Sequence, residues 1–321
     1  MDNVLFKSHN AFNRKAPLPV GAVQSTVHLY AEFKSLSNEL NQKLALRNAT
    51  SDLVRSSGGD SRAKGITIEQ AKRLKTEIAE LKARLANVES ELLCKALQIP
   101  NDTHPGSPLG TEAAAVILST HGPDPLLATP LRDHVRVARA LEMLDLEAAS
   151  IVTGSSWYFL LNEGALLELA LTNYAVSVAI NHGYSPVATP DVVKAEIAAR
   201  CGFQPRDPIE DVQQMYHLAS DPQKDRPELV LSGTAEIPLA GLFANKVFEE
   251  SQLPVKVVGI GRAFRAEAGA RGAETRGLYR VHQFSKVELF AVAGAEHSDA
   301  IMEDMREVQI DILGGLGVPF R

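Results

Sequence analysis

The chain has 321 residues, of which 45% are hydrophobic and 22% are charged, as is typical of a globular protein large enough for two domains. Its formal net charge of -6 argues against a protein that coats nucleic acid over its whole surface, but is compatible with one basic region. The 2 cysteines, Cys94 and Cys201, form no CxxC pair or Cys/His cluster, which argues against disulfides and a cysteine zinc site and favours a reducing compartment. No apolar run reaches the roughly eighteen residues of a membrane span, so neither membrane insertion nor secretion is predicted.

The N-terminal segment, residues 1–22, carries Lys7, Arg14 and Lys15 against the acidic residue Asp2. An acid-poor and basic N-terminus is typical of organellar targeting segments, and it is equally compatible with a disordered end. The composition favours the mitochondrial matrix slightly over the cytoplasm as the place of residence.

Residues 23–100 predict an antiparallel helical hairpin. Two apolar stripes recur at spacings of three and four residues, the second in the heptad pattern of a coiled coil. A Gly/Ser turn at 56–61 separates them, and the second helix should end before Pro100, because a residue before proline disfavours the α region. Each stripe can be buried against the other if the helices fold back on one another. The stripes consist of Leu29, Phe33, Leu36, Leu40 and Leu44, and of Leu74, Ile78, Leu81, Leu85, Val88 and Leu92.

The far half of this hairpin is locally basic. A charged helix face is usually only solvated, and a heptad stripe serves structure or dimerisation more often than nucleic-acid binding. A projecting basic rod can nevertheless hold a phosphate backbone, with an affinity that falls as salt rises. Both interpretations stay open on these residues alone. The basic residues are Lys43, Arg47, Arg55, Arg62, Lys64, Lys72, Arg73 and Lys75, against Asp52, Asp60 and Glu69.

Residues 101–321 predict an α+β domain that follows a turn-rich connection. Helical periods near 135–146 and 163–181 are interleaved with β-prone runs at 229–231, 255–260 and 287–293. The sequence contains no Gly-rich phosphate loop of the Walker or Rossmann type. A nucleotide would therefore have to be bound in another way.

The stretch from Gly261 to Phe290 predicts a strand, a Gly/Ala/Arg loop and a second strand. An arginine on a rigid strand, such as Arg265, offers a planar fork of donors suited to a phosphate. An aromatic residue such as Phe284 can stack on a flat base, and a carboxylate such as Glu288 can receive an ammonium group. Each residue alone is more often a surface ion pair or a core residue, so the arrangement carries the argument.

These residues also carry a resemblance to a known family. The sequence GRAFRAEAGARGAETRGLYRVHQFSKVELF, residues 261–290, resembles motif 2 of class II aminoacyl-tRNA synthetases in its seryl form. Residues 232–239, SGTAEIPL, resemble the loop that recognises serine in that family, and residues 163–190 resemble motif 1, which the family uses at its dimer interface. The helical hairpin resembles the family's N-terminal arm, which lies along the variable arm of serine tRNA. The resemblance extends from about Val23 to Arg321.

The resemblance implies an α+β fold, in which a helical hairpin arm precedes an antiparallel class II sheet flanked by helices. It implies roles for individual residues in catalysis and in ATP, serine and tRNA binding, and it assigns no residue of this chain as a metal ligand. Arg265 and Glu267 would be catalytic. ATP would be bound by Arg265, Ala266, Glu267, Val281, His282, Gln283 and Phe284; serine by Thr234, Ala235, Glu236, Arg265 and Glu288; and serine tRNA by Lys43, Arg47, Arg55, Lys72, Arg73 and Lys75.

The implied reaction is in-line attack of the serine carboxylate on the α-phosphorus of ATP, followed by transfer of serine to the 3′ end of serine tRNA. Such chemistry depends on positioning and on charge stabilisation, with Mg²⁺ helping to neutralise the triphosphate. No protein nucleophile is needed. The resemblance to motif 1 also implies a homodimer.

The sequence departs from the family after Arg321, where it stops before motif 3 and its second ATP-binding arginine. Because preorganised charge donors would be lost, this polypeptide is expected to have little activity alone and to be poorly soluble. Two alternatives to an incomplete serine-tRNA ligase stay open. One is an inactive synthetase-derived protein that binds tRNA or a partner. The other is a related ligase that charges a carrier protein, which the basic hairpin disfavours.

Overall fold

The structure of the protein is a computed structural model that describes residues 3–14, 18–56, 61–203, 214–219, 227–267 and 276–321. The side chains of residues 53–68 and of residue 112 lie outside this description. The chain divides into two compact units, Met1–Leu118 and Ser119–Arg321, which are described separately.

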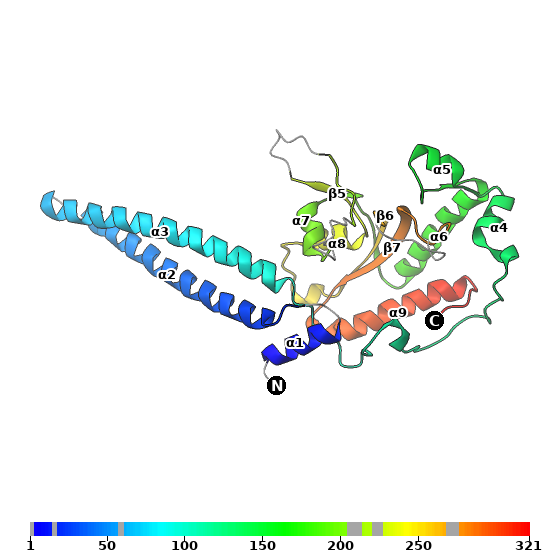
Figure 1. The fold of residues 1–321 in the computed structure, drawn as a ribbon, viewed down its shortest axis with the longest axis horizontal. Coiled ribbons are helices and arrows are strands. Elements are labelled where there is room, and N and C mark those ends of the chain that lie inside the picture. Colours follow the sequence, from blue (N-terminus) through cyan, green and yellow to red (C-terminus); the bar gives the residue numbers. More distant parts are fainter. Residues whose placement is uncertain (1–2, 15–17, 57–60, 204–213, 220–226, 268–275) are drawn as a thin grey trace. The chain divides into compact units, whose positions relative to one another are not determined.

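Two long helices, α2 (Ala22–Ser56) and α3 (Ser61–Ala96), dominate the first unit and run side by side as an antiparallel pair (Figure 1). Leu29, Leu36 and Val88 are buried between them, with Phe33 and Leu85 packed against this cluster. These are residues of the two predicted stripes, so the predicted hairpin is confirmed. The predicted turn between the helices falls largely on residues 57–60, outside the described residues.

The N-terminal segment contains a helix, α1 (Asn3–Asn13), where sequence analysis allowed a disordered end. The Asn10 side chain is buried; its amide donates to the Asn101 carbonyl at 2.9 Å, and its oxygen accepts from the Thr103 N–H at 3.2 Å. Lys7 also forms a 2.7 Å ion pair with Asp102. The structure thus has a helix here that sequence analysis did not predict, because long-range hydrogen bonds from an asparagine leave no periodic signal in the sequence.

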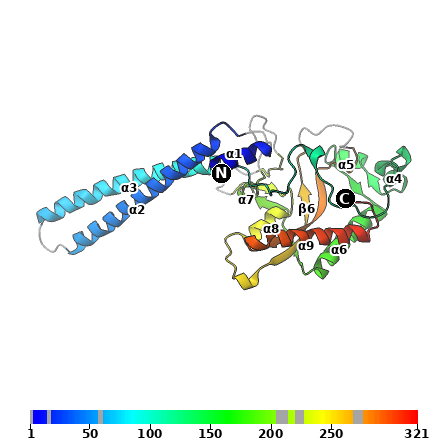
Figure 2. The same ribbon diagram turned by 90° about the horizontal axis from the view of Figure 1, so that it is seen from below.

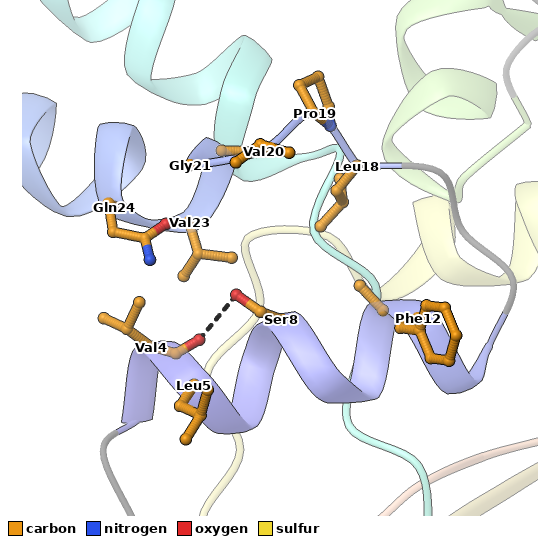
Figure 3. A pocket seen from close by; sticks show the side chains of 12 residues that line it. Val4, Leu5, Ser8, Phe12, Leu18, Pro19, Val20, Gly21, Val23 and Gln24 are labelled. Carbon is orange, nitrogen blue, oxygen red and sulfur yellow. Dashed lines mark hydrogen bonds between the residues drawn. The ribbon is translucent and has the colours of Figure 1, made fainter.

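An open cavity of about 590 Å³ lies between α1 and the start of α2. Figure 3 shows its lining, in which Leu5 and Phe12 come from α1 and residues 18–24 come from the following segment. The Ser8 hydroxyl donates to the Val4 carbonyl at 2.9 Å and so stays within its own helix.

A three-stranded sheet of order β3-β6-β7 lies at the centre of the second unit. Strand β3 (Ser185–Ala188) is parallel to β6 (Val255–Phe264), which pairs antiparallel with β7 (Gln283–Val292) over ten residue pairs. Two smaller pairs are β1 (Leu144–Asp145) with β2 (Phe159–Leu160), and β4 (Val192–Lys194) with β5 (Leu229–Leu231). The three predicted β-prone runs thus correspond to β5, β6 and β7.

Helices cover both faces of the central sheet (Figure 2). On one face Val258, Val287 and Leu289 pack against α6 (Asn162–Asn181) and α9 (Ser298–Gly315). On the other, Val257 and Phe290 pack against α8 (Glu236–Phe243). Successive strand residues point to opposite faces, so each strand contributes to both layers. Other helices of the described residues are α4 (His134–Ala140), α5 (Glu147–Val152) and α7 (Ala195–Arg200), with short 3₁₀ turns at Glu112–Ala114, Pro130–Arg132, Glu250–Gln252 and Ala295–His297.

Helix α6 is apolar well beyond the stripe that it buries. Leu166, Leu167 and Leu169 are exposed, whereas Ala179 packs in the core. Among the described residues it is the one helix long and apolar enough to cross a membrane by length and composition, a criterion that core helices of globular proteins also meet. Its Glu168 accepts a 2.7 Å hydrogen bond from Ser285 on the sheet.

Candidate functional site

The site is built on the face of β6 and β7 that is turned toward α8. Phe284, Lys286 and Glu288 alternate along β7, so all three side chains share this face. Their partners on β6 are the small residues Ala263, Gly261 and Gly259, respectively. A Cβ atom at Gly259 would lie 2.8 Å from Leu239 of α8, so glycine there permits the close approach of the helix.

Arg265 follows β6 directly and lies beside Phe284. Its guanidinium carbon lies over the Phe284 ring, 5.2 Å from the centroid, and its Nε donates to the Gly233 carbonyl at 3.4 Å. The strand pairing brings the two residues together, because Phe284 is opposite Ala263, two residues before Arg265. A cation beside an aromatic ring places a phosphate-binding group next to a surface on which a flat base can stack.

A triangle of hydrogen bonds joins Thr234, Lys286 and Glu288. The Thr234 hydroxyl donates to Glu288 Oε2 at 2.7 Å, while Lys286 Nζ lies 2.5 Å from the same oxygen and 2.9 Å from Thr234 Oγ1. Thr234 is only 2% exposed. Glu288 therefore already holds an ammonium group, which is the kind of ligand expected for it. Sequence analysis did not single out Lys286, although the period of two places it on the same face as Phe284 and Glu288.

The two other residues of the predicted serine loop face different surroundings. Ala235 is buried and packs with Leu239 and Val257, so its side chain belongs to the core. Glu236 is exposed in the first turn of α8, and its N–H donates to Thr234 Oγ1 at 3.3 Å. Burial, followed by the charge of Glu236, raises the pKa of the nearby Cys201 thiol.

Glu267 and Ala266 continue the chain beyond Arg265. The Glu267 carboxylate forms a 2.7 Å ion pair with Arg280, and its φ of 48° lies in the left-handed region that side chains other than glycine seldom adopt. The N–H of Ala266 donates to the Gln214 carbonyl at 3.0 Å. Most of the predicted loop that follows, 268–275, lies outside the described residues.

Residues 281–284 do not present their side chains to one face. Val281 is buried, and Gln283 points to the opposite face from Phe284, where it lines a 330 Å³ cavity with Arg262 and Ser285. The prediction of four consecutive nucleotide-lining residues can therefore hold for main-chain groups, but the Gln283 side chain does not lie on the face of Arg265. Strand alternation is the physical reason.

The His282 ring lies among aromatic residues that sequence analysis did not single out. Tyr216 Oη is 2.7 Å from His282 Nδ1, and the Trp157 ring stacks on the imidazole with centroids 5.6 Å apart and planes at 19°. His282 Nδ1 is also 3.0 Å from the Arg265 carbonyl oxygen. Burial, and then the negative charge of Glu267, raise the pKa of Tyr216, so its hydroxyl stays protonated at neutral pH. Both partners come from segments distant in sequence, which no local pattern connects.

The hairpin carries its predicted basic residues in two kinds of environment. Lys43 forms a 2.6 Å ion pair with Glu77, and this hydrogen bond raises the pKa of Lys43. Lys72, Arg73 and Lys75 are exposed on α3. Arg47 contacts the neighbouring Asn48 side chain at 3.0 Å. The Arg55 side chain lies outside the described residues, as do those of Arg62 and Lys64.

Within the described part of the chain, no group of three or more His, Cys, Asp or Glu side chains could hold a metal ion. Cys94 and Cys201 are both free.

Comparison with known proteins identifies both parts of the chain. Residues 216–321 match the tRNA synthetase class II core domain (G, H, P, S and T), which defines the second unit as a class II aminoacyl-tRNA synthetase core. Residues 10–103 match the seryl-tRNA synthetase N-terminal domain. The serine-tRNA ligase of Treponema denticola is 36% identical over 296 residues, covering 92% of this chain and 68% of that protein. The chain therefore belongs to the seryl-tRNA synthetase family.

Further comparisons agree on the fold and on the length. The mitochondrial serine-tRNA ligase of Schizosaccharomyces pombe is 39% identical over 317 residues, 97% of this chain and 64% of that protein. The crystal structure of seryl-tRNA synthetase from Pyrococcus horikoshii complexed with ATP covers 100% of this chain, with a TM-score of 0.81 and 26% identity, and the match covers 74% of that chain. The chain thus spans about two thirds of the length of the curated relatives. The predicted α+β class and family are confirmed.

Proposed function

We propose that this chain activates serine with ATP to form seryl-adenylate and pyrophosphate, and then transfers the seryl group to the 3′ end of serine tRNA with release of AMP. The main support for this proposal is that the Arg265–Phe284 pair and the Thr234–Lys286–Glu288 triangle share one face of β6 and β7. A phosphate-binding cation, a stacking surface and an ammonium-binding carboxylate are what the first half-reaction requires of its pocket.

ATP would lie with its adenine on the Phe284 ring and its α-phosphate at the Arg265 guanidinium. Main-chain groups of residues 281–284 would border the base. Mg²⁺ fits this arrangement as a partner of the triphosphate, and it would neutralise phosphate charge during attack. Arg265 would hold the α-phosphate as negative charge develops on it.

Serine would place its ammonium group on Glu288, with Thr234 as the neighbouring hydrogen-bond partner. Lys286 occupies that position in the free pocket, 2.5 Å from Glu288. The serine ammonium must therefore displace the lysine ammonium. Serine's carboxylate can then attack the α-phosphorus, and pyrophosphate leaves without a covalent enzyme intermediate.

Serine-dependent exchange of pyrophosphate into ATP tests this half-reaction. Arg265→Ala should lower exchange by roughly 10²-fold to 10³-fold, as the loss of one preorganised charge donor does in other enzymes. Arg262→Ala is the matched control, because Arg262 is on the same strand but lines the cavity on the opposite face. Equal exchange by the two variants would contradict the assignment of Arg265.

We propose further that the 321-residue polypeptide by itself exchanges slowly. Within the described residues, β7 has no strand on its outer edge, and Arg265 is the arginine that lies over the Phe284 ring. Robust serine-dependent exchange by the purified polypeptide would overturn this statement. ATP and tRNA binding without any exchange would instead favour the alternative function, an inactive synthetase-derived binding protein.

The hairpin would hold serine tRNA through its exposed basic residues. Replacing Lys72, Arg73 and Lys75 together by glutamine should weaken tRNA binding and reduce the slope of log K against log salt by about one unit per lost phosphate contact. Lys82, Arg84 and Lys95, three basic residues nearer the base of α3, provide a control triple. Filter binding at several salt concentrations measures both quantities, and an unchanged slope would reject the arm assignment.

A further proposal concerns the oligomeric state. The exposed leucines of α6 form an apolar surface suited to a homodimer interface, since such surfaces are seldom left in water.

Another proposal concerns the cellular location. Two relatives, from Schizosaccharomyces pombe and Saccharomyces cerevisiae, are mitochondrial by name. Mitochondrial residence is therefore favoured over the cytoplasm, and fractionation of cells that express a tagged chain would decide between them.

A further inference from the structure

The ladder between β6 and β7 ends in an unusual exchange of partners. One pair beyond Phe264 and Gln283, the Arg265 N–H still donates to the His282 carbonyl at 2.9 Å. The His282 N–H does not return the bond, because it donates to the Ser156 carbonyl at 3.1 Å. In a regular antiparallel pair it would donate to the Arg265 carbonyl. That carbonyl instead meets the His282 side chain, whose Nδ1 lies at 3.0 Å.

The His282 ring therefore replaces a main-chain donor. A carbonyl can only accept, so the proposed role of His282 requires the tautomer with its proton on Nδ1, which lies 3.0 Å from the Arg265 carbonyl oxygen and 2.7 Å from Tyr216 Oη. Trp157 stacks on the ring and limits its rotation. The Tyr216 carbonyl accepts from the Leu231 N–H at 2.9 Å, which fixes the tyrosine to β5.

A second contact from the same segment holds the next residue. The Gln214 carbonyl accepts from the Ala266 N–H at 3.0 Å. Residues 214–216 thus hold the main chain of Arg265 and Ala266 at two successive residues, one directly and one through His282. We call Gln214, Tyr216 and His282 the Arg265 clamp.

We propose that His282 and Tyr216 are positioning residues that set the direction of the Arg265 side chain through its main-chain carbonyl, and that Trp157 makes this contact visible by fluorescence. The inference rests on the proposed nucleotide binding by Arg265 and deepens it. Neither His282 nor Tyr216 needs to touch ATP through its side chain. Because Trp157 is the 1 tryptophan of the chain, the tryptophan emission reports the surroundings of this indole, which include the His282 and Tyr216 rings.

Calorimetric titration of the 321-residue chain with MgATP, and separately with serine, tests the clamp. Tyr216→Phe should weaken ATP binding roughly threefold to tenfold, as expected for one hydrogen bond, and His282→Leu by roughly tenfold or more. His282→Asn should recover much of the loss, because the asparagine amide can donate near the position of Nδ1. Serine binding should weaken less than ATP binding, because the hydrogen bonds described for the Thr234–Lys286–Glu288 triangle do not involve Gln214, Tyr216 or His282.

Tyr174→Phe is the matched control, because it removes a tyrosine hydroxyl whose one hydrogen bond among the described residues is to the Asp311 carbonyl at 3.4 Å. MgATP should change the Trp157 emission of the wild-type chain, and Tyr216→Phe should alter that change, whereas Tyr174→Phe should not. If His282→Leu fails to fold, Tyr216→Phe carries the test, because it deletes one oxygen atom.

Three results would overturn the clamp: ATP affinity within twofold of wild type in both His282→Leu and Tyr216→Phe, no recovery in His282→Asn, or equal losses of ATP and serine affinity. A wild-type chain that binds no MgATP would refute the proposed nucleotide binding, and the clamp with it. Normal wild-type binding with unaffected variants would refute the clamp alone.

Discussion

Asp304 on α9 should contribute strongly to the stability of the second unit. Its carboxylate accepts a hydrogen bond from the buried Tyr184 hydroxyl at 3.0 Å and forms a 2.9 Å ion pair with Lys256 on β6. Lys256 Nζ also lies 4.8 Å from the Tyr184 ring centroid. One carboxylate thus joins α9 to the sheet and to the residue that precedes β3.

Asp304→Ala leaves a buried hydroxyl and a half-buried ammonium group without this partner. Each unpaired group lowers the free energy of unfolding by about 1–3 kcal/mol when it is fully buried. Because the Asp304 side chain is 31% exposed, we expect a total loss of only about 2 kcal/mol. For a unit of this size, that lowers the melting temperature by about 4–8 °C. Glu307→Gln, which neutralises an exposed carboxylate on the same helix, should change stability by less than about 0.5 kcal/mol.

The pH dependence gives an independent check. Burial alone would raise the pKa of Asp304, but the hydrogen bonds from Lys256 and Tyr184 outweigh it and lower the pKa below its ordinary value. A depressed carboxyl pKa stabilises the fold above the unfolded pKa of about 4 and loses this contribution as the pH falls through the folded value. Calorimetric melting of wild type and Asp304→Asn should therefore differ at pH 7 and converge in acid. A constant difference from pH 7 to below pH 4 would refute the reasoning.

Two further predictions concern ligand binding and assembly. Lys286→Met should lower the free energy of unfolding by about 1–2 kcal/mol and yet strengthen serine binding up to about tenfold, because the competing ammonium is removed from Glu288. Thermal melting and serine calorimetry measure the two effects, and weaker serine binding would contradict the displacement of lysine. Leu166→Asp should convert a dimer to a monomer in light-scattering measurements, because Leu166 is 65% exposed on the apolar face of α6. Val247→Asp is the control, because Val247 is exposed but lies outside α6, and it should leave the molar mass measured by light scattering unchanged.

The helical hairpin could be predicted because its signal is local. Leu74, Ile78 and Val88 recur at heptad spacing and are buried. The neighbourhood of Arg265 and Phe284 could also be anticipated, since a strand, a loop and a returning strand bring their ends together. In both cases the residues that meet are linked by a simple period or by a single connection.

The rest of the site could not be predicted for identifiable reasons. Lys286 was missed because a lysine two residues from a glutamate on a strand is usually a surface pair. Tyr216 and Trp157 approach His282 from distant segments, and this convergence has no periodic trace. The ion pair of Glu267 with Arg280 depends on a loop geometry that the sequence does not specify, and contact of Glu267 with the nucleotide stays a prediction.

The core face of the central sheet determines where the site residues point. Val258, Ile260 and Arg262 on β6 are opposite Leu289, Val287 and Ser285 on β7. The apolar members pack on α6 and α9, so a slip of one residue would bring Phe284, Lys286 and Glu288 into that core. Burying a lysine and a glutamate there without partners would cost far more than the slip could gain. The hydrophobic residues on the face that packs against α6 and α9 therefore fix the strand register that places Phe284, Lys286 and Glu288 on the face turned toward α8. Removing the Asp304 contacts with Tyr184 and Lys256, which lie on the α6 and α9 face, should therefore weaken the packing that positions these site residues, although Asp304 contacts none of them.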